Sequence, residues 1–553
     1  RKITCADCTL CVPHPCPDLI PGHSWLLCRL GSRILSRACS VRVQVHLRAS
    51  VWLDACLHAP VWWSQHQHRP WYIAGVDTYQ VRSTDFATNR RFWSMMTSVK
   101  GIDAEPPAGM DELRYYGADL ECRVTISGTK LNFFAVGSLE NRRVRQHTYH
   151  TVWSGAAERT ATPCAPVLAV WNRGASIISS RGAAVAVDES YDVGGGQWGV
   201  ILFGNGCQRA ERSPLSLSVL LDALRLVQNP VTNLTPAWFL TNEMCAAGRA
   251  EHAGVWGLVR SARQESPSAR LRCMDVSALS LRVWRDIFTF PPEAAEVRQK
   301  GQTFAAPRLT RMPMAAAKEG SARLSNTHVV TGGTGGLGVL TARWLADRGV
   351  ERLLLASRKG KVAPSSKANF QRLKQSKTAV LVSICDVGEM TGVRRLCSDA
   401  LPQGFSGIWH TAGVLADKLV GAQTAHTLQP VFASKVSGTA ALLAGSSQAP
   451  TDQFVLFSSI AGLFFGMAQS NYASANTTLD ATASGRLMRG QAALAVQWGP
   501  WAEVGMATAS VVRTRIHSSG LGLIDPTYGL VALQGLIFGS AKDAAVAVSP
   551  MKW

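Results

Sequence analysis

Apolar and polar positions alternate most clearly in the second half of the chain, where short apolar runs are separated by helical patterns. A β-type run at residues 328–330 enters a glycine-rich turn, after which Leu337, Leu340, Trp344 and Leu345 recur on one helix face. Further apolar runs predict a buried strand at residues 353–356 and strands at 379–384, 407–410 and 454–457. This alternation predicts a parallel, doubly wound sheet with function at the carboxyl ends of its strands.

The glycine-rich turn is the most informative motif, because it stands between a predicted strand and a predicted helix. Glycines allow a tight turn and a close approach to a pyrophosphate, whose charge is stabilised at a helix N-terminus. The turn therefore predicts a dinucleotide-binding site formed by Thr331, Gly332, Gly333, Thr334, Gly335, Gly336, Leu337 and Gly338.

The end of the second strand indicates which dinucleotide is bound. An NAD site usually places an acidic residue about 20 positions beyond the glycines. This chain has Ser357 and Arg358 there, followed by Lys359. A carboxylate would repel a 2′-phosphate, whereas arginine can pair with it through two hydrogen bonds. The sequence thus favours NADPH over NADH, the alternative being a solvated basic turn.

Four polar residues that follow this motif in the sequence predict acid–base chemistry. Ser459 ends a predicted strand, Tyr472 follows thirteen positions later, and Asn476 lies one helical turn beyond the tyrosine on the same face. A phenol has a pKa near 10, so it needs a nearby cation to donate a proton at neutral pH, and Lys435 is the candidate. Ser459 would donate a hydrogen bond to a carbonyl oxygen where negative charge develops.

With these motifs, residues 323–553 resemble the catalytic subdomain of a ketoreductase from a type I modular polyketide synthase. Such ketoreductases are relatives of the short-chain dehydrogenases/reductases and of the fatty acid synthase ketoreductase. The family places its lysine before the serine in a KVxG segment and an asparagine four positions after the tyrosine, as Lys435 and Asn476 stand here. The matching segments are TGGTGGLG (331–338), ASR (356–358), CDV (385–387), HTAGVL (410–415), FSSIAG (457–462), NYASAN (471–476) and WGPW (498–501).

The resemblance implies reduction of a β-ketoacyl thioester, held on the phosphopantetheine arm of an acyl carrier protein, to the β-hydroxyacyl thioester. NADPH would deliver its pro-S hydride to the β-carbon while Tyr472 donates the proton. The implied partners are the carrier protein and neighbouring synthase domains. Two alternatives remain, a fatty acid synthase-type ketoreductase and a catalytically silent structural domain. The resemblance adds four residues to the cofactor site: Asp386, Val387, Ala412 and Gly413.

The family's markers of product configuration are incomplete in this chain. One product class carries Leu-Asp-Asp after the HxAG motif, and here the segment is Leu415, Ala416 and Asp417. The other class carries a tryptophan eight positions before the tyrosine, where this chain has Phe464. A partial first motif and a missing tryptophan favour the first class, which gives the D-hydroxy product.

Residues 148–322 resemble the structural subdomain of such ketoreductases, a shortened Rossmann unit that braces the catalytic one and binds no cofactor. Upstream, residues 45–145 resemble the second hotdog half of a polyketide dehydratase, with Asp54 in the segment of its catalytic acid. The histidine motif of the first half is missing, so we expect this region to be inactive. An unrelated β-rich segment is the alternative, and residues 1–44 are unassigned. The predicted fold class is α/β, with two Rossmann-like doubly wound subdomains and an N-terminal β-rich, hotdog-like fragment.

Composition narrows the possible partners of this 553-residue chain, whose length predicts about three or four domains. The net charge of +20 admits nucleic acid, an anionic membrane or an acidic protein. The charge is spread along the chain and no nucleic-acid-binding motif is present, so we expect an acidic carrier protein and no nucleic acid. The chain contains no apolar run of the roughly 18 residues that a membrane span requires.

Cysteine use predicts a reducing compartment and no metal site. Seven of the fourteen cysteines lie at or before Cys56, and the others are scattered singly, which favours a cytoplasmic location. The residues Cys5, Cys8, Cys11 and Cys16 come close to an iron–sulfur spacing, but one residue too many precedes the last cysteine.

Overall fold

The computed structural model divides into two compact units, Arg1–Arg143 and Val144–Trp553. Outside the ranges that follow, the structure describes only the backbone of several short strands. It describes residues 147–156, 200–204, 217–245, 250–277, 290, 294–312, 324, 326–400, 405–447, 451–464, 466–502, 521–539 and 543–551.

The first unit contains a four-stranded antiparallel sheet with the strand order β3-β6-β5-β4. An antiparallel sheet agrees with the β-rich segment predicted here. The hotdog and dehydratase resemblance stays a prediction, and Asp54 lies outside the described residues. The strands of this unit are β1 (Thr4–Cys5), β2 (Val41–Arg42), β3 (Trp71–Ile73), β4 (Glu112–Arg114), β5 (Glu121–Ile126) and β6 (Thr129–Ala135).

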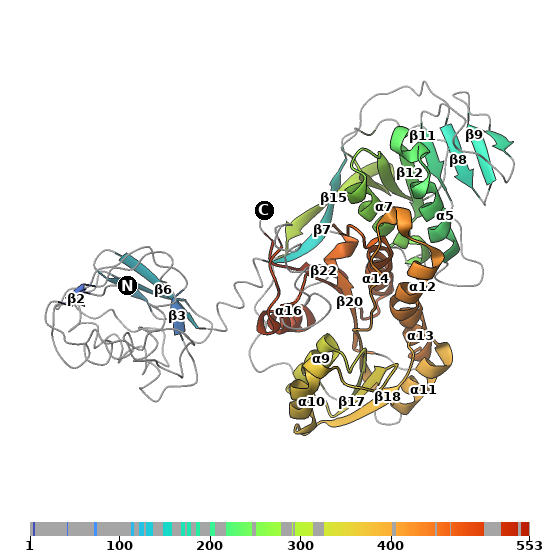
Figure 1. Ribbon diagram of the computed structural model, residues 1–553. Coiled ribbons are helices and arrows are strands. Elements are labelled where there is room, and N and C mark those ends of the chain that lie inside the picture. Colours follow the sequence, from blue (N-terminus) through green and yellow to red (C-terminus); the bar gives the residue numbers. More distant parts are fainter. Residues whose placement is uncertain are drawn as a thin grey trace. The chain divides into compact units, whose positions relative to one another are not determined.

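The second unit is built on one sheet of sixteen strands, and its C-terminal half has the order β18-β17-β16-β19-β20-β21-β22 (Figure 1). All neighbours in this half are parallel, as the sequence predicted. Its strands are β16 (Thr327–Thr331), β17 (Arg352–Ser357), β18 (Ala379–Ile384), β19 (Phe405–His410), β20 (Gln453–Ser459), β21 (Leu494–Trp498) and β22 (Ala545–Val548). Its helices are α9 (Gly336–Ala346), α10 (Lys367–Lys374), α11 (Met390–Ala400), α12 (Ala425–Phe432), α13 (Gly438–Gly445), α14 (Ser470–Met488) and α16 (Pro526–Phe538).

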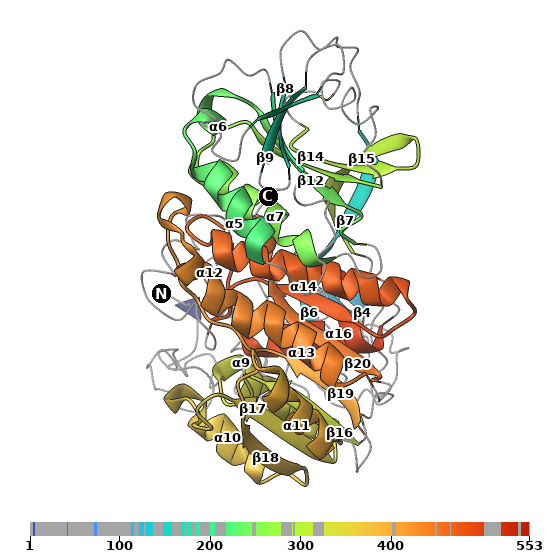
Figure 2. The ribbon, with the colours of Figure 1, turned by 90° about the vertical axis from the view of Figure 1, so that its right-hand side faces the viewer.

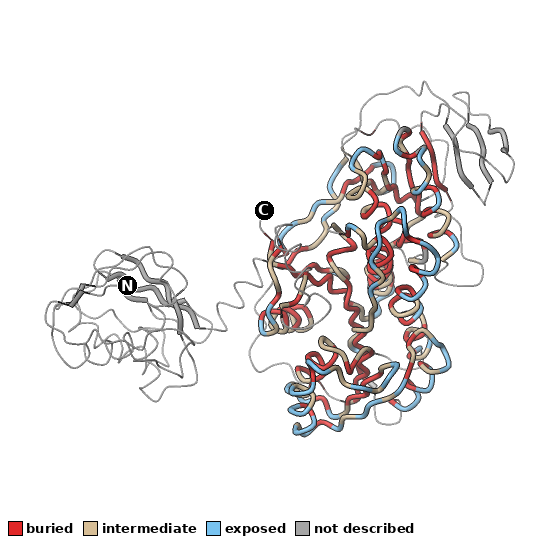
Figure 3. Tube along the Cα trace, viewed as in Figure 1, coloured by how far each residue is buried: buried red, intermediate tan, exposed pale blue. Residues whose placement is uncertain are grey.

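Helices cover both faces of this parallel half because its strand residues alternate between the faces. Val330 and Leu355 belong to a core cluster with residues of α9, α10 and α16, whereas Val329 and Leu354 belong to one with residues of α11, α13 and α14. Figures 2 and 3 show α14 lying along the sheet, buried over much of its length. The carboxyl end of β20 and the turn that follows it therefore pack against α14.

The N-terminal half of the sheet contains the predicted structural subdomain and is continuous with the parallel half. Strand β7 pairs antiparallel with both β15 and β22, which joins the two predicted Rossmann-like subdomains into one sheet and confirms the α/β fold class. The subdomain boundaries at 148–322 and 323–553 stay predictions. The strands of this half are β7 (Thr148–Gly155), β8 (Val167–Trp171), β9 (Gly174–Ile178), β10 (Ala184–Val187), β11 (Val200–Phe203), β12 (Ala237–Asn242), β13 (Leu271–Val276), β14 (Glu296–Lys300) and β15 (Thr303–Arg311). Its helices are α5 (Leu217–Gln228), α6 (Val231–Leu234) and α7 (Gly254–Glu265).

Helix α7 crosses α14 at very short range, which brings the two halves of the unit into backbone contact. A Cβ atom at Gly257 of α7 would lie 2.4 Å from the carbonyl oxygen of Ala473 and 2.6 Å from the amide nitrogen of Ser474. Only glycine fits at this crossing, and Ala473 directly follows Tyr472 in α14. The packing of α7 therefore fixes the helix that carries the predicted proton donor.

Within the described residues, no helix is long and apolar enough to cross a membrane. The same residues contain no group of three or more histidine, cysteine or acidic side chains able to hold a metal ion. The four N-terminal cysteines with near iron–sulfur spacing have no described side chains.

We expect Gly257→Ala to lower the midpoint of thermal unfolding. Replacing glycine by alanine inside a helix ordinarily stabilises by about 0.5–1 kcal/mol, but overpacking a dense contact costs about 1–3 kcal/mol. Gly155→Ala in β7 is the matched control, because nothing lies within 4 Å of its added Cβ. A midpoint for Gly257→Ala that equals or exceeds the wild-type value would reject the crossing geometry.

Candidate active site

The glycine turn between β16 and α9 is as tight as the motif predicted. Gly332 has a φ of +65°, a conformation that side chains disfavour, and a Cβ there would lie 2.9 Å from the backbone of Ala412. A Cβ at Gly338 would lie 2.2 Å from the carbonyl oxygen of Gly332. Gly335 caps the N-terminus of α9, so the positive end of the helix dipole faces the turn.

A cavity of about 350 Å³ lies over this turn and along the carboxyl ends of the neighbouring strands. Twelve of the fourteen predicted cofactor residues line it, and the two that do not, Thr331 and Gly333, lie behind the turn. Thr331 is fully buried, and a Cβ on Gly333 would lie 2.6 Å from the carbonyl oxygen of Val330. The lining consists of Gly332, Thr334, Gly335, Gly336, Leu337, Gly338, Ala356, Ser357, Arg358, Lys359, Lys361, Cys385, Asp386, Val387, Thr411, Ala412, Gly413, Val414 and Ser434.

One end of this cavity is basic. Arg358, Lys359 and Lys361 lie in its wall, and all three side chains are exposed. Among the residues that the structure describes, Arg358 has no hydrogen-bond or ion-pair partner, so its guanidinium is available to an anion. The only carboxylate in the lining, Asp386, accepts a hydrogen bond from the amide of Gly388 at 2.9 Å. The glycine cradle, the helix N-terminus and these cations fit a phosphorylated dinucleotide.

Lys435 is buried beside this cavity in a π-helical turn, Ala433–Ser437, inserted between α12 and α13. Its Nζ donates a hydrogen bond to the carbonyl oxygen of Phe457 at 2.8 Å and lies 5.3 Å from the centre of the Tyr472 ring. A Cβ on Gly413 would lie 3.1 Å from Cε of Lys435, so this glycine makes room for the lysine. Turns of this kind often occur at functional sites, because they redirect side chains out of a regular helix.

Burial lowers the pKa of Lys435 from 10.5 to about 8, and the charge of Asp480 partly opposes this effect. A shift of this size corresponds to a cost of about 3 kcal/mol for holding the ammonium group in the protein interior. Burial also raises the pKa of Asp480 to about 6, while hydrogen bonds from Gln497 and Ser458 and the charges of Arg260 and Lys435 lower it. At neutral pH the lysine is therefore protonated, and the ionised carboxylate of Asp480 on α14 stabilises its charge.

Tyr472 and Ser459 lie beside this lysine, with Asn476 one helical turn beyond the tyrosine. Burial raises the pKa of Tyr472, and the side chains of Asn476 and Ser459 lower it. The Ser459 Oγ, at the end of β20, accepts a hydrogen bond from the amide of Ala461 at 3.2 Å. Asn476 donates to the carbonyl oxygen of Tyr472 at 2.8 Å. The four predicted residues thus come together, with a neutral phenol at pH 7 that retains the proton it would donate.

His410 connects the glycine turn to the lysine. Its Nδ1 lies 2.6 Å from the Thr331 hydroxyl and its Nε2 lies 3.0 Å from the carbonyl oxygen of Lys435. Because a carbonyl only accepts, Nε2 carries the proton and Nδ1 accepts from threonine. Burial and the nearby Lys435 charge lower the pKa of His410 to about 4, so the ring stays neutral.

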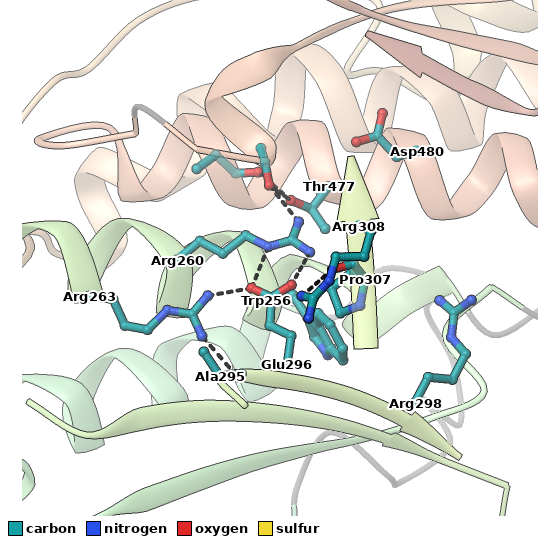
Figure 4. A network of polar contacts seen from close by, with 12 residues as sticks. Trp256, Arg260, Arg263, Ala295, Glu296, Arg298, Pro307, Arg308, Thr477 and Asp480 are labelled. Carbon is teal, nitrogen blue, oxygen red and sulfur yellow. Dashed lines mark hydrogen bonds and ion pairs between the residues drawn. The ribbon is translucent and has the colours of Figure 1, made fainter. Parts of the chain in front are cut away.

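Sequence reasoning missed a set of buried charges contributed by the other half of the sheet (Figure 4). Arg260 of α7 binds Glu296 through two hydrogen bonds of 2.9 and 2.7 Å and donates to the carbonyl oxygen of Gly462 at 2.6 Å. Burial favours the neutral form of Glu296, but Arg260 and Arg263 lower its pKa to about 2. The Arg260 guanidinium therefore holds the turn that follows Ser459. Asp480, on α14, was also missed. Its position was detectable from the sequence, because it lies four residues beyond Asn476 on the same helix face.

Comparison with known proteins agrees with this geometry. Residues 326–503 match the family model described as "KR domain". This part of the chain is a ketoreductase domain of the polyketide synthase type. The ketoreductase domain contains the glycine turn, Lys435, Ser459, Tyr472 and Asp480. Domains of this family are oxidoreductases of the short-chain dehydrogenase/reductase type that bind a nicotinamide cofactor.

The curated relatives are much longer proteins. Polyketide synthase GfsB from Streptomyces halstedii is 36% identical over 248 residues, which is 44% of this chain and 4% of the relative. The pikromycin polyketide synthase component PikAIII from Streptomyces venezuelae is 32% identical over 286 residues, or 49% of this chain and 18% of the relative. The chain thus spans a small part of the length of the curated relatives that it matches.

Solved ketoreductases have the same fold as the second unit. A structure of A-type ketoreductases from a modular polyketide synthase is 26% identical, with a TM-score of 0.65, and covers 74% of this chain and 94% of the solved chain. The first ketoreductase of the tylosin polyketide synthase is 25% identical, with a TM-score of 0.61 and the same coverage.

We expect turnover of this ketoreductase domain to depend on protonated Lys435 and on the charge of Asp480, which raises the pKa of the lysine. Since the lysine loses its proton at about pH 8, kcat/KM should fall as the pH rises through this value. Asp480→Asn removes the charge that raises the pKa of Lys435, so the alkaline limb should move to lower pH. Asp452→Asn, at an exposed residue directly before β20, is the matched control. If the alkaline limb of the kcat/KM profile does not move in Asp480→Asn, or moves equally in Asp452→Asn, the effect of the Asp480 charge on the pKa of Lys435 is contradicted.

Proposed function

We propose that this chain uses NADPH to reduce a carrier-protein-bound β-ketoacyl thioester to the β-hydroxyacyl thioester in polyketide biosynthesis. The observation that carries the proposal is the grouping of Lys435, Ser459, Tyr472 and Asn476 beside a glycine-lined cavity with a basic end. The bound nicotinamide supplies the hydride for the β-carbon. Everything else in the reaction is done by the protein's own side chains.

Tyr472 is the proton donor in this proposal. Its phenol gives a proton to the substrate carbonyl oxygen as that oxygen becomes an alkoxide, and the resulting phenolate lies beside the Lys435 ammonium. Ser459 donates a hydrogen bond to the same oxygen and stabilises its developing charge. Asn476 holds the backbone of Tyr472, and Lys435 is held by Phe457, so both groups are oriented before substrate binds.

Three observations support an active reductase over a silent scaffold. The acid–base group is intact in this sequence, burial raises the pKa of Tyr472 so that its proton is retained, and the basic wall is open to a 2′-phosphate. The named relatives are polyketide synthases, which favours a function in polyketide biosynthesis over one in fatty acid biosynthesis. Since those relatives are multidomain synthases, we also propose an acyl carrier protein and neighbouring synthase domains as partners. A cytoplasmic location stays a prediction from the cysteine pattern.

The D-hydroxy configuration also stays a prediction. Asp417, the remaining aspartate of the marker motif, accepts a hydrogen bond from Gln469 at 2.9 Å, three residues before Tyr472. This contact connects the loop that contains Asp417 with the residue that precedes α14, the helix that carries the proton donor.

The first experiment follows NADPH oxidation by its near-ultraviolet absorbance with a β-ketoacyl-N-acetylcysteamine thioester, and NADH is run in parallel. NADPH-dependent turnover is expected, and chiral analysis of the product then tests the configuration. Bound NADPH without turnover, even when the substrate is presented on an acyl carrier protein, would reject the proposed activity in favour of a silent domain.

We expect Tyr472→Phe to abolish reduction while NADPH binding, measured by fluorescence titration, stays unchanged. Removing a positioned proton donor typically costs about 10²–10⁴-fold in rate. Tyr528→Phe on α16 is the matched control, since this buried tyrosine packs on the opposite side of the sheet. Undiminished turnover by Tyr472→Phe would eliminate the proton-donor role.

We expect Arg358→Asp to weaken NADPH binding far more than NADH binding, because the new carboxylate repels the 2′-phosphate. The control is Arg372→Asp, which makes the same charge change on the exposed face of α10, outside the cavity lining. Dissociation constants for both dinucleotides are compared for each variant. Equal weakening of the two in Arg358→Asp would reject the role in phosphate recognition.

A further inference from the structure

The backbone immediately before α14 is held in an unfavourable conformation. Ala468 has a φ of +59°, in the left-handed region that residues with a Cβ atom disfavour. Such conformations persist only where the surrounding structure imposes them, and they concentrate at functional sites. Ala468 lies four residues before Tyr472, and the next residue, Gln469, caps α14. The direction in which the tyrosine helix begins is therefore set at this strained position.

Glu265, the last residue of α7, binds the strained residue from the other half of the sheet. Its Oε1 accepts a hydrogen bond from the amide of Ala468 at 2.8 Å, and its Oε2 accepts one from the amide of Val420 at 2.6 Å. The carbonyl oxygen of Ala468 accepts from the amide of Lys418 at 2.8 Å. Both backbone groups of Ala468 are thus fixed, and one carboxylate connects two loops that are distant in sequence.

These two loops flank the proposed proton donor. The segment 414–423 leaves the cavity wall at Val414 and contains the marker aspartate Asp417, while the segment 466–471 leads directly into Tyr472. Gln469 and Asn471 of the second segment bind Asp417 and the carbonyl oxygen of Ala416 at 2.9 and 2.8 Å. A displacement of either loop would therefore move the other.

Gln228 of α5 binds only one of the two loops, in contrast to Glu265. Its side-chain amide donates to the carbonyl oxygens of Val420 and Gln423 at 2.8 and 2.9 Å, so it holds the first loop alone. Glu265 is the residue that reaches both loops, through two charge-assisted hydrogen bonds. Removing it would release the amide of Ala468 and leave the left-handed conformation without its support on that side.

We infer that Glu265 is a positioning residue for the reduction: its carboxylate holds Ala468 in the left-handed conformation and thereby sets where Tyr472 meets the substrate carbonyl. The inference deepens the proposed function and rests on it for its kinetic part. Through Glu265, the N-terminal half of the sheet would directly influence the position of the proton donor Tyr472.

The test uses a double-mutant cycle in the full 553-residue chain. We expect Glu265→Ala to lower kcat by about tenfold or more with NADPH binding unchanged, because a displacement of about 1 Å can cost about a hundredfold. Ala468→Gly alone should change kcat by less than about twofold, since glycine accepts a positive φ without strain. In the double variant, Ala468→Gly should restore most of the activity lost in Glu265→Ala. Asp222→Ala, which removes a carboxylate paired within α5, is the matched control.

Hydrogen exchange measured by mass spectrometry provides a readout that does not depend on turnover. In Glu265→Ala, the segments containing Val420 and Ala468 should both lose protection, whereas Gln228→Ala should affect the first segment alone. Glu265→Gln is the second variant, to be used if Glu265→Ala does not fold. It keeps the side-chain volume but has only one acceptor oxygen, so one of the two segments should lose protection.

The outcomes separate this inference from the proposed function. Wild-type protein without reductase activity would overturn the proposed function, and hydrogen exchange would still decide whether Glu265 holds both loops. Active wild-type protein with unchanged kcat or unchanged exchange in Glu265→Ala would overturn the inference alone. A lower thermal midpoint with no rescue of kcat by Ala468→Gly would show a purely structural role and would also overturn it.

Discussion

The contact between the backbones of α7 and α14 is the constraint on which the active-site geometry depends. Gly257 permits it, and Ser261 and Glu265 follow at intervals of four residues, so they continue the same row along α7. Ser261 donates a hydrogen bond to the carbonyl oxygen of Gly466, and Glu265 binds the amide of Ala468. One helix face thus holds α14 by direct backbone packing at one end and holds the turn before it by polar contacts at the other.

Buried charge is the second constraint, and it carries an energetic cost that the packing must offset. Around α14, Lys435 is buried and Asp480, Arg260 and Glu296 are only partly exposed to water. For Asp480, the folded-state pKa of about 6 lies above its ordinary value of 3.8. Between these values the folded chain binds a proton that the unfolded chain releases, so this group reduces stability as the pH rises from about 4 to 6. At neutral pH Asp480 is ionised in spite of this cost in stability. Its negative charge raises the pKa of Lys435 and so favours the protonated lysine.

Features that depend on local chain geometry were predictable from the sequence. The glycine turn needs residues without a Cβ at Gly332 and Gly338, and the strands β16 to β20 need short apolar runs, so both leave a pattern in the sequence. The spacing of Ser459, Tyr472 and Asn476 is similarly local to one strand end and one helix. Lys435 was proposed from the need of the phenol for a nearby cation, and the family resemblance agreed, but the π-helical turn that directs its side chain inward has no sequence signature of its own.

Features that depend on contacts between distant segments were not predictable. Arg260, Glu265 and Glu296 are ordinary charged residues in the sequence, and nothing near them indicates that they lie beside Gly462 and Ala468, some 160 to 200 residues away. The positive φ of Ala468 was equally hidden, because alanine gives no sign of a left-handed conformation. Both features depend on contacts between the two halves of the unit, which are joined by the pairing of β7 with β22 and by the packing of α7 on α14.

His410 shows why the cofactor turn and the acid–base group behave as one site. Its neutral ring accepts from Thr331, whose strand enters the glycine turn, and donates to the carbonyl of Lys435 in the π-helical turn. A protonated ring would lose the acceptor at Nδ1 and place a second positive charge beside the lysine. Because burial and the Lys435 charge lower the pKa of His410 to about 4, neither change occurs near neutral pH. The turn that would hold the dinucleotide phosphates and the lysine beside Tyr472 therefore keep a fixed relation while the His410 ring is neutral, which includes neutral pH.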